Sequence, residues 1–253
     1  MRCTLSVAII TRNEEVNLRR TLSSVLWADQ LVVVDAQSTD QTVALAQTTG
    51  AEVIVEEWKG FAAQKNLAIA NCTCDWILSL DADEELTADL AAEIQALLAE
   101  NPPCDAYTLP RRNFFLGRVL RYGGFYPDRK LRLFRRGSAK FTDRPVHETM
   151  VCSGTVGHLQ GDLFHHAYPT LPTYIEHMDR YSTLGAEILI RSGRISRNPI
   201  AFTWNVAAAP FLNFFYSYVL RFGFLDGREG LLMHLYHASY VSWKYAKAWH
   251  AAK

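Results

Sequence analysis

The stretch that decides the fold is Asp75-Trp-Ile-Leu-Ser-Leu-Asp-Ala-Asp-Glu-Glu85. It begins with the apolar, β-favouring run Trp76–Leu80 and ends with four carboxylates within five residues. A buried strand that ends in acidic residues delivers them to the carboxyl edge of an open α/β sheet, where ligands bind. Asp81 and Asp83 are two residues apart, so on an extended chain they point to the same side. We therefore predict that these two carboxylates hold Mg²⁺ or Mn²⁺ together with a phosphate.

The segments around this stretch alternate between apolar strands and amphipathic helices. The expected strands are Thr4–Ile10, Gln30–Val34, Val53–Glu56 and Trp76–Leu80, and the expected helices include Phe61–Ala70 and one that Thr87 caps. This alternation predicts an α/β fold with a mostly parallel sheet, right-handed crossovers and strand ends that converge on one crevice. An acidic loop that only caps the next helix is the alternative for Asp81 and Asp83.

Glycine-rich phosphate loops are absent from the sequence. No Gly-x-Gly-x-x-Gly follows the first strand, and no Gly-Lys-Ser/Thr occurs anywhere. Dinucleotide oxidoreductases and P-loop enzymes depend on these loops to hold phosphate through the backbone. A nucleotide diphosphate bound here would instead need a metal ion and basic side chains.

The charge distribution agrees with a site that combines a metal ion with basic side chains. The net charge of the 253 residues is zero, but residues 1–100 carry 6 basic and 16 acidic side chains, and residues 101–162 carry 11 and 5. The first part suits cations and the second suits anions, although a solvated asymmetry without a role is the alternative. Neutral overall charge and the absence of a recognised binding motif argue against nucleic acid. Five scattered cysteines predict a reducing compartment without a disulfide framework, and no export signal is expected at the N-terminus.

Three motifs in this order resemble the family 2 glycosyltransferases of GT-A fold. They are Val7-Ala-Ile-Ile-Thr-Arg-Asn-Glu-Glu15, Leu31-Val-Val-Val-Asp-Ala-Gln-Ser-Thr-Asp-Gln-Thr42 and Leu78-Ser-Leu-Asp-Ala-Asp-Glu-Glu85. Within that family the chain is similar to bacterial enzymes that add a sugar to the lipopolysaccharide inner core. That further similarity lies in Gln64-Lys-Asn66, Arg132-Leu-Phe-Arg135, Val146-His-Glu148 and Phe224-Leu-Asp-Gly-Arg228. Ala36 departs from the pattern, because many members have a second acid there.

The resemblance implies a site for a UDP-sugar. Thr11, Asn13 and Glu14 would line the nucleoside pocket, Asp35 would accept a hydrogen bond from uracil, and Lys65 would approach the nucleotide. The resemblance also implies that Asp81 holds the ribose or the metal ion and that Asp83 holds the metal ion itself. Each residue has an ordinary alternative: Asn13 as a helix cap, Asp35 as a turn former and Lys65 on a solvated helix face.

The middle of the chain is assigned to the acceptor. Tyr107–Arg112 and Lys130–Phe134 are expected strands, and the Gly-rich, aromatic segment Phe114–Tyr126 is expected to form a loop over the acceptor cleft. Lys130 and Arg132 alternate onto one strand face, where they could contact phosphate. A solvated strand face is the alternative.

Glycosyl transfer needs a base that takes the proton of the acceptor hydroxyl. We predict Glu148 as this base, because Val-His-Glu matches the part of the chain in which the family carries it. His147 is the competitor and a further candidate for acceptor or phosphate contact, with Asp128 and Asp143 as weaker candidates. Direct attack with one base would invert the anomeric centre. The alternative for Glu148 is an ion pair with Arg144.

The last third of the chain is helical and aromatic. Helices are expected over Tyr174–Ile190 and about Gly230–Trp249, and no residue between Arg197 and Arg221 is formally charged. Pro199 and Pro210 interrupt this uncharged segment, and arginines flank it. The pattern favours helices on an anionic membrane surface, with a spanning helix or a buried interface as alternatives.

Together these patterns predict a metal-dependent, inverting hexosyltransferase with two regions. Residues 1–162 would form the GT-A domain (donor half 1–103, acceptor half 104–162), and residues 163–253 an amphipathic helical region on the inner face of the cytoplasmic membrane. The donor would be a UDP-sugar, with glucose as the first candidate sugar, and the acceptor a lipid-linked saccharide such as the lipopolysaccharide inner core. The rival functions are transfer to polyprenyl phosphate and a catalytically silent nucleotide-sugar-binding or membrane-scaffold protein.

Overall fold

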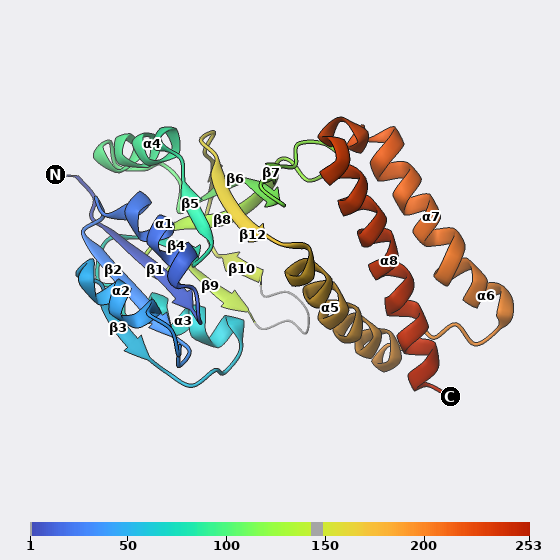
Figure 1. Cartoon of the computed structure of the whole chain (residues 1–253). Coiled ribbons are helices and arrows are strands. Elements are labelled where there is room, and N and C mark those ends of the chain that lie inside the picture. Colours follow the sequence, from blue (N-terminus) through green and yellow to red (C-terminus); the bar gives the residue numbers. More distant parts are fainter. Residues whose placement is uncertain (1, 143–148) are drawn as a thin grey trace. The chain divides into compact units, whose positions relative to one another are not determined.

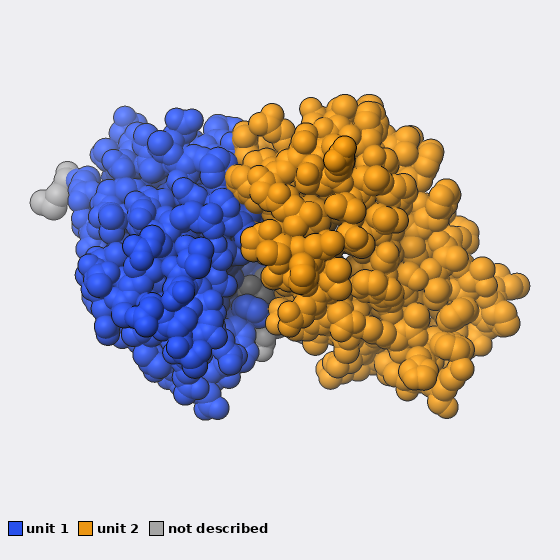
Figure 2. All heavy atoms as spheres, viewed as in Figure 1, with its two compact units in different colours: residues 1–111, 128–166 blue, residues 112–127, 167–253 orange. Residues whose placement is uncertain are grey.

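The computed structural model describes residues 2–142 and 149–253 of the chain. It divides into two compact units (Figures 1 and 2). Unit 1 comprises residues 1–111 and 128–166, and unit 2 comprises residues 112–127 and 167–253. Each unit therefore contains segments that are far apart in the sequence.

Unit 1 begins with alternating strands and helices. They are β1 (Leu5–Thr11), α1 (Glu15–Val25), β2 (Gln30–Asp35), α2 (Thr42–Thr48), β3 (Glu52–Val55), α3 (Phe61–Ala70) and β4 (Trp76–Asp81). The four strands pair in parallel in the order β3-β2-β1-β4. The predicted parallel sheet with helical crossovers is therefore confirmed, with strand bounds within about one residue of those expected.

Both faces of these strands are buried, because side chains alternate along each strand. Val7 and Ile9 pack on one side with apolar residues of α1, α2 and α4 (Ala88–Ala99). Ala8 and Ile10 pack on the other side with α3. Thr87 caps α4 as predicted, since its hydroxyl accepts a hydrogen bond from the Leu90 amide at 3.2 Å.

Beyond β4 the sheet becomes mostly antiparallel. The remaining strands are β5 (Glu84–Leu86), β6 (Ala106–Phe115), β7 (Arg118–Val119), β8 (Asp128–Arg135), β9 (Ala139–Thr142), β10 (Thr149–Cys152), β11 (Val156–His158) and β12 (Leu163–Tyr168). The full order is β3-β2-β1-β4-β8-β6-β12-β5, with β7 and β11 paired to β6 and a separate β9–β10 hairpin. The sheet is thus mixed: its donor half is parallel, and most of the strands added later run antiparallel.

Unit 2 is mainly helical. Its elements are α5 (Leu171–Arg191), α6 (Pro199–Thr203), the π-helical turns η1 (Trp204–Ala208) and η2 (Phe215–Leu220) on either side of α7 (Ala209–Phe214), the 3₁₀ turn η3 (Gly223–Asp226) and α8 (Gly227–Ala251). In Figure 1, α7 lies alongside α8. None of the helices in the described ranges is both long and apolar enough to cross a membrane.

Pro210 lies inside the helical path instead of ending it. A proline has no N–H, so the carbonyl of Val206, four residues earlier, loses its usual helical donor. The hydroxyl of Ser242 on α8 donates to that carbonyl at 2.7 Å and replaces the missing bond. The expected interruption therefore holds at Pro199, which begins α6, but not at Pro210.

Asp226 joins two distant segments within unit 2. Its buried carboxylate accepts hydrogen bonds from the amides of Arg121 and Tyr122, at 3.1 and 2.9 Å. This contact fixes part of the segment that was predicted to be an acceptor loop. It also gives the Phe224-Leu-Asp-Gly-Arg228 motif a structural role.

Candidate active site

Three neighbouring strands end together and bring the predicted donor residues to one edge of the sheet. The register places Thr11 of β1 opposite Asp35 of β2, and Ile10 of β1 opposite Asp81 of β4. Adjacent strands lie about 4.8 Å apart, so the backbones of Asp35 and Asp81 are about 10 Å apart, with β1 between them. Asp83 follows β4 by two residues. The carboxyl edge of the parallel sheet therefore carries a concentrated set of acidic and polar groups.

The carboxylate of Asp35 is fully buried and shapes the turn that follows β2. It accepts hydrogen bonds from the amide of Ser38, at 2.7 Å, and from the Ser38 hydroxyl. Asp35 therefore has the role of turn former, which was the alternative to contact with uracil. A uracil ring would reach Asp35 only if the turn around Ser38 moved.

Asn13 holds the same turn from the side of β1. Its φ of 53° lies in the left-handed region, which Asn tolerates better than most residues. Its side-chain oxygen accepts a hydrogen bond from the backbone amide of Thr39 at 2.8 Å. Its backbone amide donates to the Ser38 hydroxyl at 2.7 Å. Asn13 does not cap α1, because Glu14 occupies the cap position.

Thr11 and Glu14 complete the β1 end of the site. The Thr11 hydroxyl is buried and has no hydrogen-bond partner within the described part of the chain. Burial raises the pKa of Glu14; a hydrogen bond from Asn17 opposes this, and the nearby charge of Asp83 adds to it. A raised carboxylate pKa and an unpaired buried hydroxyl are typical of a polar ligand site.

Asp81 is held by two buried cations. Lys65 of α3 lies 2.6 Å from its Oδ1, and Arg132 of β8 lies 2.6 Å from its Oδ2. Burial alone would raise the pKa of Asp81, but Arg132 and Lys65 outweigh this and hold the pKa far below its ordinary value. Asp81 is therefore ionised, with both oxygens engaged.

The same ion-pair network continues into the predicted acceptor strands. Arg132 also bonds the fully buried Glu84 at 2.7 Å, and Glu84 accepts from the Asp81 amide at 3.0 Å. Arg111 of β6 links Glu84 to Asp128. Burial would raise the pKa of Asp128, but Arg111 and Lys130 together lower it to about 2. Removing one member would leave a buried charge uncompensated.

Lys130 and Arg132 differ in exposure, although they are two residues apart on the same strand. Arg132 is buried and its guanidinium bonds Asp81 and Glu84. The Lys130 side chain is 40% exposed and pairs with Asp128 at 2.9 Å. Of the two, only Lys130 is open to an incoming anion in this arrangement.

Two histidines of β12 that no sequence motif indicated lie beside the acids. The Nε2 atom of His165 is 3.4 Å from Asp83 Oδ2, and that of His166 is 3.0 Å from Glu85 Oε2. Because β12 pairs with β5, His165 lies opposite Glu84. The only sequence signal was the His165-His166 pair itself, and nothing local connects it with residues some eighty positions earlier.

The donor atoms fit a divalent ion through Asp83 more readily than through Asp81. Asp83 and His165 offer a carboxylate oxygen and an imidazole nitrogen, whereas both Asp81 oxygens are paired with cations. Within residues 2–142 and 149–253, no three His, Cys, Asp or Glu side chains form a metal-binding group. Mg²⁺ and Mn²⁺ that bridge a diphosphate need only one or two protein carboxylates, since phosphate and water supply the rest.

The proposed base lies outside the described residues. Glu148 and its competitors His147 and Asp143, like Arg144, fall in residues 143–148. The flanking strands are described: Thr142 of β9 pairs with Thr149 of β10. The side chain of Asn66 exchanges two hydrogen bonds with the backbone of Phe141, at 2.8 and 2.9 Å, so α3 anchors this hairpin.

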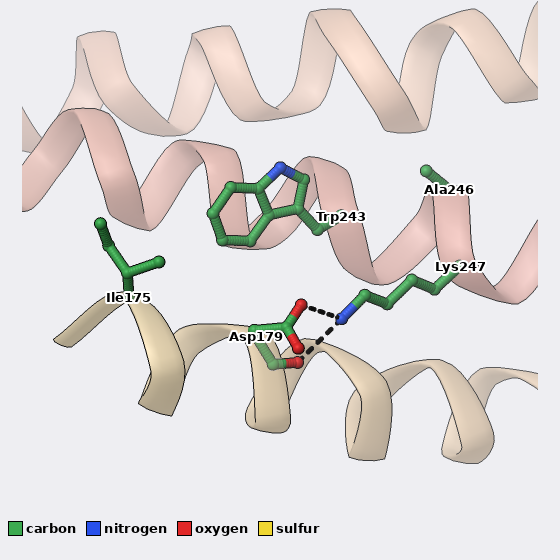
Figure 3. Close-up of a pocket in the computed structure, with 5 residues that line it drawn as sticks. All are labelled: Ile175, Asp179, Trp243, Ala246 and Lys247. Carbon is green, nitrogen blue, oxygen red and sulfur yellow. Dashed lines mark hydrogen bonds and ion pairs between the residues drawn. The ribbon is translucent and has the colours of Figure 1, made fainter. Parts of the chain in front are cut away.

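A separate hollow of about 320 Å³ lies between α5 and α8 in unit 2 (Figure 3). It is lined by Ile175, Asp179, Trp243, Ala246 and Lys247. The Lys247 ammonium reaches across it to Asp179 at 2.6 Å. None of the predicted site residues that the structure describes lines it.

Comparison with known proteins gives a consistent family. Residues 6–154 match the family model described as glycosyl transferase family 2. An uncharacterised glycosyltransferase of Rickettsia typhi is 30% identical over 90% of this chain and 80% of its own. The lipopolysaccharide core biosynthesis glycosyltransferase LpsC of Rhizobium meliloti is 34% identical over 76% of this chain and 74% of its own.

Among solved structures, the mannosyltransferase PcManGT from Pyrobaculum calidifontis, in complex with GDP-Man and Mn²⁺, has a TM-score of 0.56. The two chains are 15% identical, and the match covers 98% of this chain and 87% of that one. At this identity the likeness establishes the fold alone. The fold is the GT-A type that the motifs predicted, with a C-terminal helical extension.

Proposed function

The chain belongs to glycosyl transferase family 2, and from that premise we propose that it transfers a hexose from a UDP-sugar to a lipid-linked saccharide. Glucose is the first candidate sugar, and the lipopolysaccharide inner core is the first candidate acceptor. The acceptor class is supported by the Rhizobium meliloti relative, whose name assigns it to lipopolysaccharide core biosynthesis.

The observation that carries the donor site is the shared edge of β1, β2 and β4. Asp35 ends β2 opposite Thr11, Asp81 ends β4 opposite Ile10, and Asp83 follows Asp81 by two residues. Ligands of open α/β sheets bind at such an edge. In the proposed site Thr11, Asn13 and Glu14 line the nucleoside pocket, and Asp35 contacts uracil after the turn at Ser38 opens.

Asp83, together with His165, would hold Mg²⁺ or Mn²⁺. When bound, such an ion neutralises the charge that develops on the departing diphosphate. The Pyrobaculum calidifontis protein, which has the same fold, is in complex with Mn²⁺ and GDP-Man, and this supports the use of a divalent ion but not the choice of its ligands. Lys65 and Arg132 would act on the site indirectly, because they hold the carboxylate of Asp81 in position.

Glu148 is proposed as the base. Its carboxylate takes the proton of the acceptor hydroxyl while the hydroxyl oxygen bonds to the anomeric carbon. The bond from that carbon to the UDP oxygen breaks on the opposite face, so UDP leaves and the configuration inverts. The strands β9 and β10 of one hairpin precede and follow Glu148 in the chain. Asn66, the residue after Lys65, anchors that hairpin through its hydrogen bonds to Phe141.

The chain would then work at the inner face of the cytoplasmic membrane. Residues 1–103 would bind the donor, residues 104–162 would receive the acceptor, and residues 163–253 would associate peripherally with the bilayer. Lys130 is the candidate for acceptor or phosphate contact, since its side chain is 40% exposed. His147 is a second candidate for that contact.

The experiment is a screen of UDP-sugars with and without Mn²⁺, with a core oligosaccharide as acceptor and release of UDP as readout. Release that requires one UDP-sugar, the ion and the acceptor is the expected result. Release only with a polyprenyl phosphate acceptor would replace the proposed acceptor class. Binding of UDP without release under any of these conditions would favour a silent nucleotide-sugar-binding protein.

A further inference from the structure

The helical path from α6 to η2 carries an unusually apolar exposed surface. Its exposed side chains recur at helical spacing and include several large aromatic rings. They are Ile200, Trp204, Phe211, Leu212, Phe215, Tyr216, Val219 and Leu220, with exposed fractions from 38% to 84%. We call these eight residues the aromatic stripe. Soluble monomers rarely leave a contiguous apolar surface of this kind uncovered, so it needs an occupant.

The stripe belongs to one face of the helix. Ile200, Trp204, Phe211, Phe215 and Val219 are exposed, whereas the intervening Pro210 is buried and Phe202, Phe214 and Tyr218 are half-buried. The opposite side of the path packs on α8, which lies alongside α7 in Figure 1. There the Ser242 hydroxyl donates to the Val206 carbonyl, and the Phe202 ring contacts Trp249. The aromatic stripe therefore lies on the side of the path that α8 does not cover.

Positive charge stands at both ends of the stripe. Arg194 and Arg197 precede α6, and Arg221 follows η2, all three exposed. Between Glu187 and Asp226 the sequence has four arginines and no acid. In the part of the chain that the structure describes, no carboxylate pairs with Arg194, Arg197 or Arg221. An apolar strip with cations at both ends matches a membrane surface, where acyl chains lie beneath anionic headgroups.

A second copy of the chain fits the same surface poorly. In a two-fold symmetric interface the stripe would contact itself, and closing it antiparallel would bring Arg221 of one copy towards Arg194 and Arg197 of the other. Like charges without an intervening acid oppose such an interface. Aromatic residues such as Trp204 and Tyr216 are also the residue types that settle at the boundary between headgroups and acyl chains.

We propose that the aromatic stripe, with Arg194, Arg197 and Arg221, is a docking surface for an anionic lipid bilayer, on which the helical path from Pro199 to Leu220 lies parallel to the membrane plane. A path of 22 residues is about 33 Å long, so both arginine groups reach the headgroups of the same leaflet only when the helix lies flat. This deepens the proposed function, because it names the surface that brings the enzyme to a lipid-linked acceptor.

The test is flotation of the full chain with vesicles of phosphatidylcholine, with and without phosphatidylglycerol. Binding to the anionic vesicles is expected. The double variant Trp204→Glu/Phe211→Glu should lower the partition coefficient by about tenfold or more, and Arg194→Gln/Arg197→Gln by about tenfold with a weaker salt dependence. Matched controls are Leu26→Glu, an apolar residue 57% exposed on unit 1, and Arg19→Gln/Arg136→Gln, two exposed arginines of unit 1; both should bind like the wild type.

Unfolding curves that match the wild type show that each variant is folded. Equal vesicle binding by the wild type and the Trp204/Phe211 variant would overturn the proposal. So would a wild type that ignores vesicles but is dimeric in light scattering, with the same variant monomeric, because the surface would then join two copies. Calorimetry with UDP on the same samples separates the two claims: absent UDP binding would refute the proposed function and leave the vesicle result unaffected.

Discussion

The ammonium nitrogen of Lys65 lies 2.6 Å from Oδ1 of Asp81, although Lys65 is only 3% exposed. The next residue, Asn66, exchanges two hydrogen bonds with the backbone of Phe141. One turn of α3 therefore fixes both the acid at the end of β4 and the strand that leads to the proposed base. This explains why Gln64-Lys-Asn66 can matter for function without touching a substrate.

The ion pairs of Asp81 predict a pH-dependent stability. Because the folded protein lowers the pKa of Asp81, its stabilisation is present above the unfolded value of about 3.9 and is lost as the pH falls below it. Asp81→Asn leaves Lys65 and Arg132 without their shared carboxylate and should lower the free energy of unfolding by about 3 kcal/mol at neutral pH. Denaturant unfolding between pH 7 and pH 3 should show that this difference shrinks in acid.

Asp89→Asn is the matched control, because Asp89 is exposed in the first turn of α4. Its effect on the free energy of unfolding should stay within about 0.5–1 kcal/mol at neutral pH. A deficit of Asp81→Asn that stays constant down to pH 3 would contradict the ion-pair account.

Asp83 and His165 predict the metal dependence. Asp83→Asn and His165→Gln should each weaken Mn²⁺ binding in the presence of UDP by at least about tenfold, since each removes one candidate donor atom. His166→Gln should leave Mn²⁺ affinity nearly unchanged, because His166 pairs with Glu85. Calorimetric titration of Mn²⁺ into the UDP-saturated protein measures all three. An Asp83→Asn protein with wild-type Mn²⁺ affinity would exclude this site.

Asp226 predicts a local loss of stability in unit 2. Asp226→Ala would leave the amides of Arg121 and Tyr122 without their charged acceptor, at a cost of about 1.5–3 kcal/mol. Hydrogen exchange should accelerate in residues 116–127 before it does in β1. Asp179→Ala, which removes an acid whose side chain is 67% exposed, is the control and should leave exchange in 116–127 unchanged. Unchanged exchange in Asp226→Ala would show that Asp226 does not hold this segment.

The parallel part of the sheet was predictable because its signals are local. Each strand is a short apolar run and each is followed by a helix with its own periodicity, as in β1 and α1. The edge at which Thr11, Asp35 and Asp81 meet then follows from the direction of parallel strands. The mixed character of the later sheet was not predictable in this way, since β8 and β6 pair antiparallel without a hairpin between them.

The pairing of charges in the site depends on contacts between distant residues. Arg132 lies 51 positions after Asp81 and reaches it only because β8 pairs antiparallel with β4. The alternating pattern of β8 predicted Arg132 on the same side as Lys130, but it gave no sign that one would be buried and the other exposed. His165 was missed for the same reason, since its position next to Asp83 requires the pairing of β12 with β5.

Glu148→Gln tests the chemical step separately from donor binding. The amide cannot accept the proton of the acceptor hydroxyl, so kcat for transfer should fall by about 10²–10⁴-fold. The dissociation constant for UDP should not change, because the proposed nucleoside contacts come from Thr11, Asn13, Glu14 and Asp35. His147→Gln is the matched control and retains most of kcat if Glu148 is the base. Full transfer by Glu148→Gln would refute the assignment and favour an acceptor that is already ionised, such as polyprenyl phosphate, which needs no strong base.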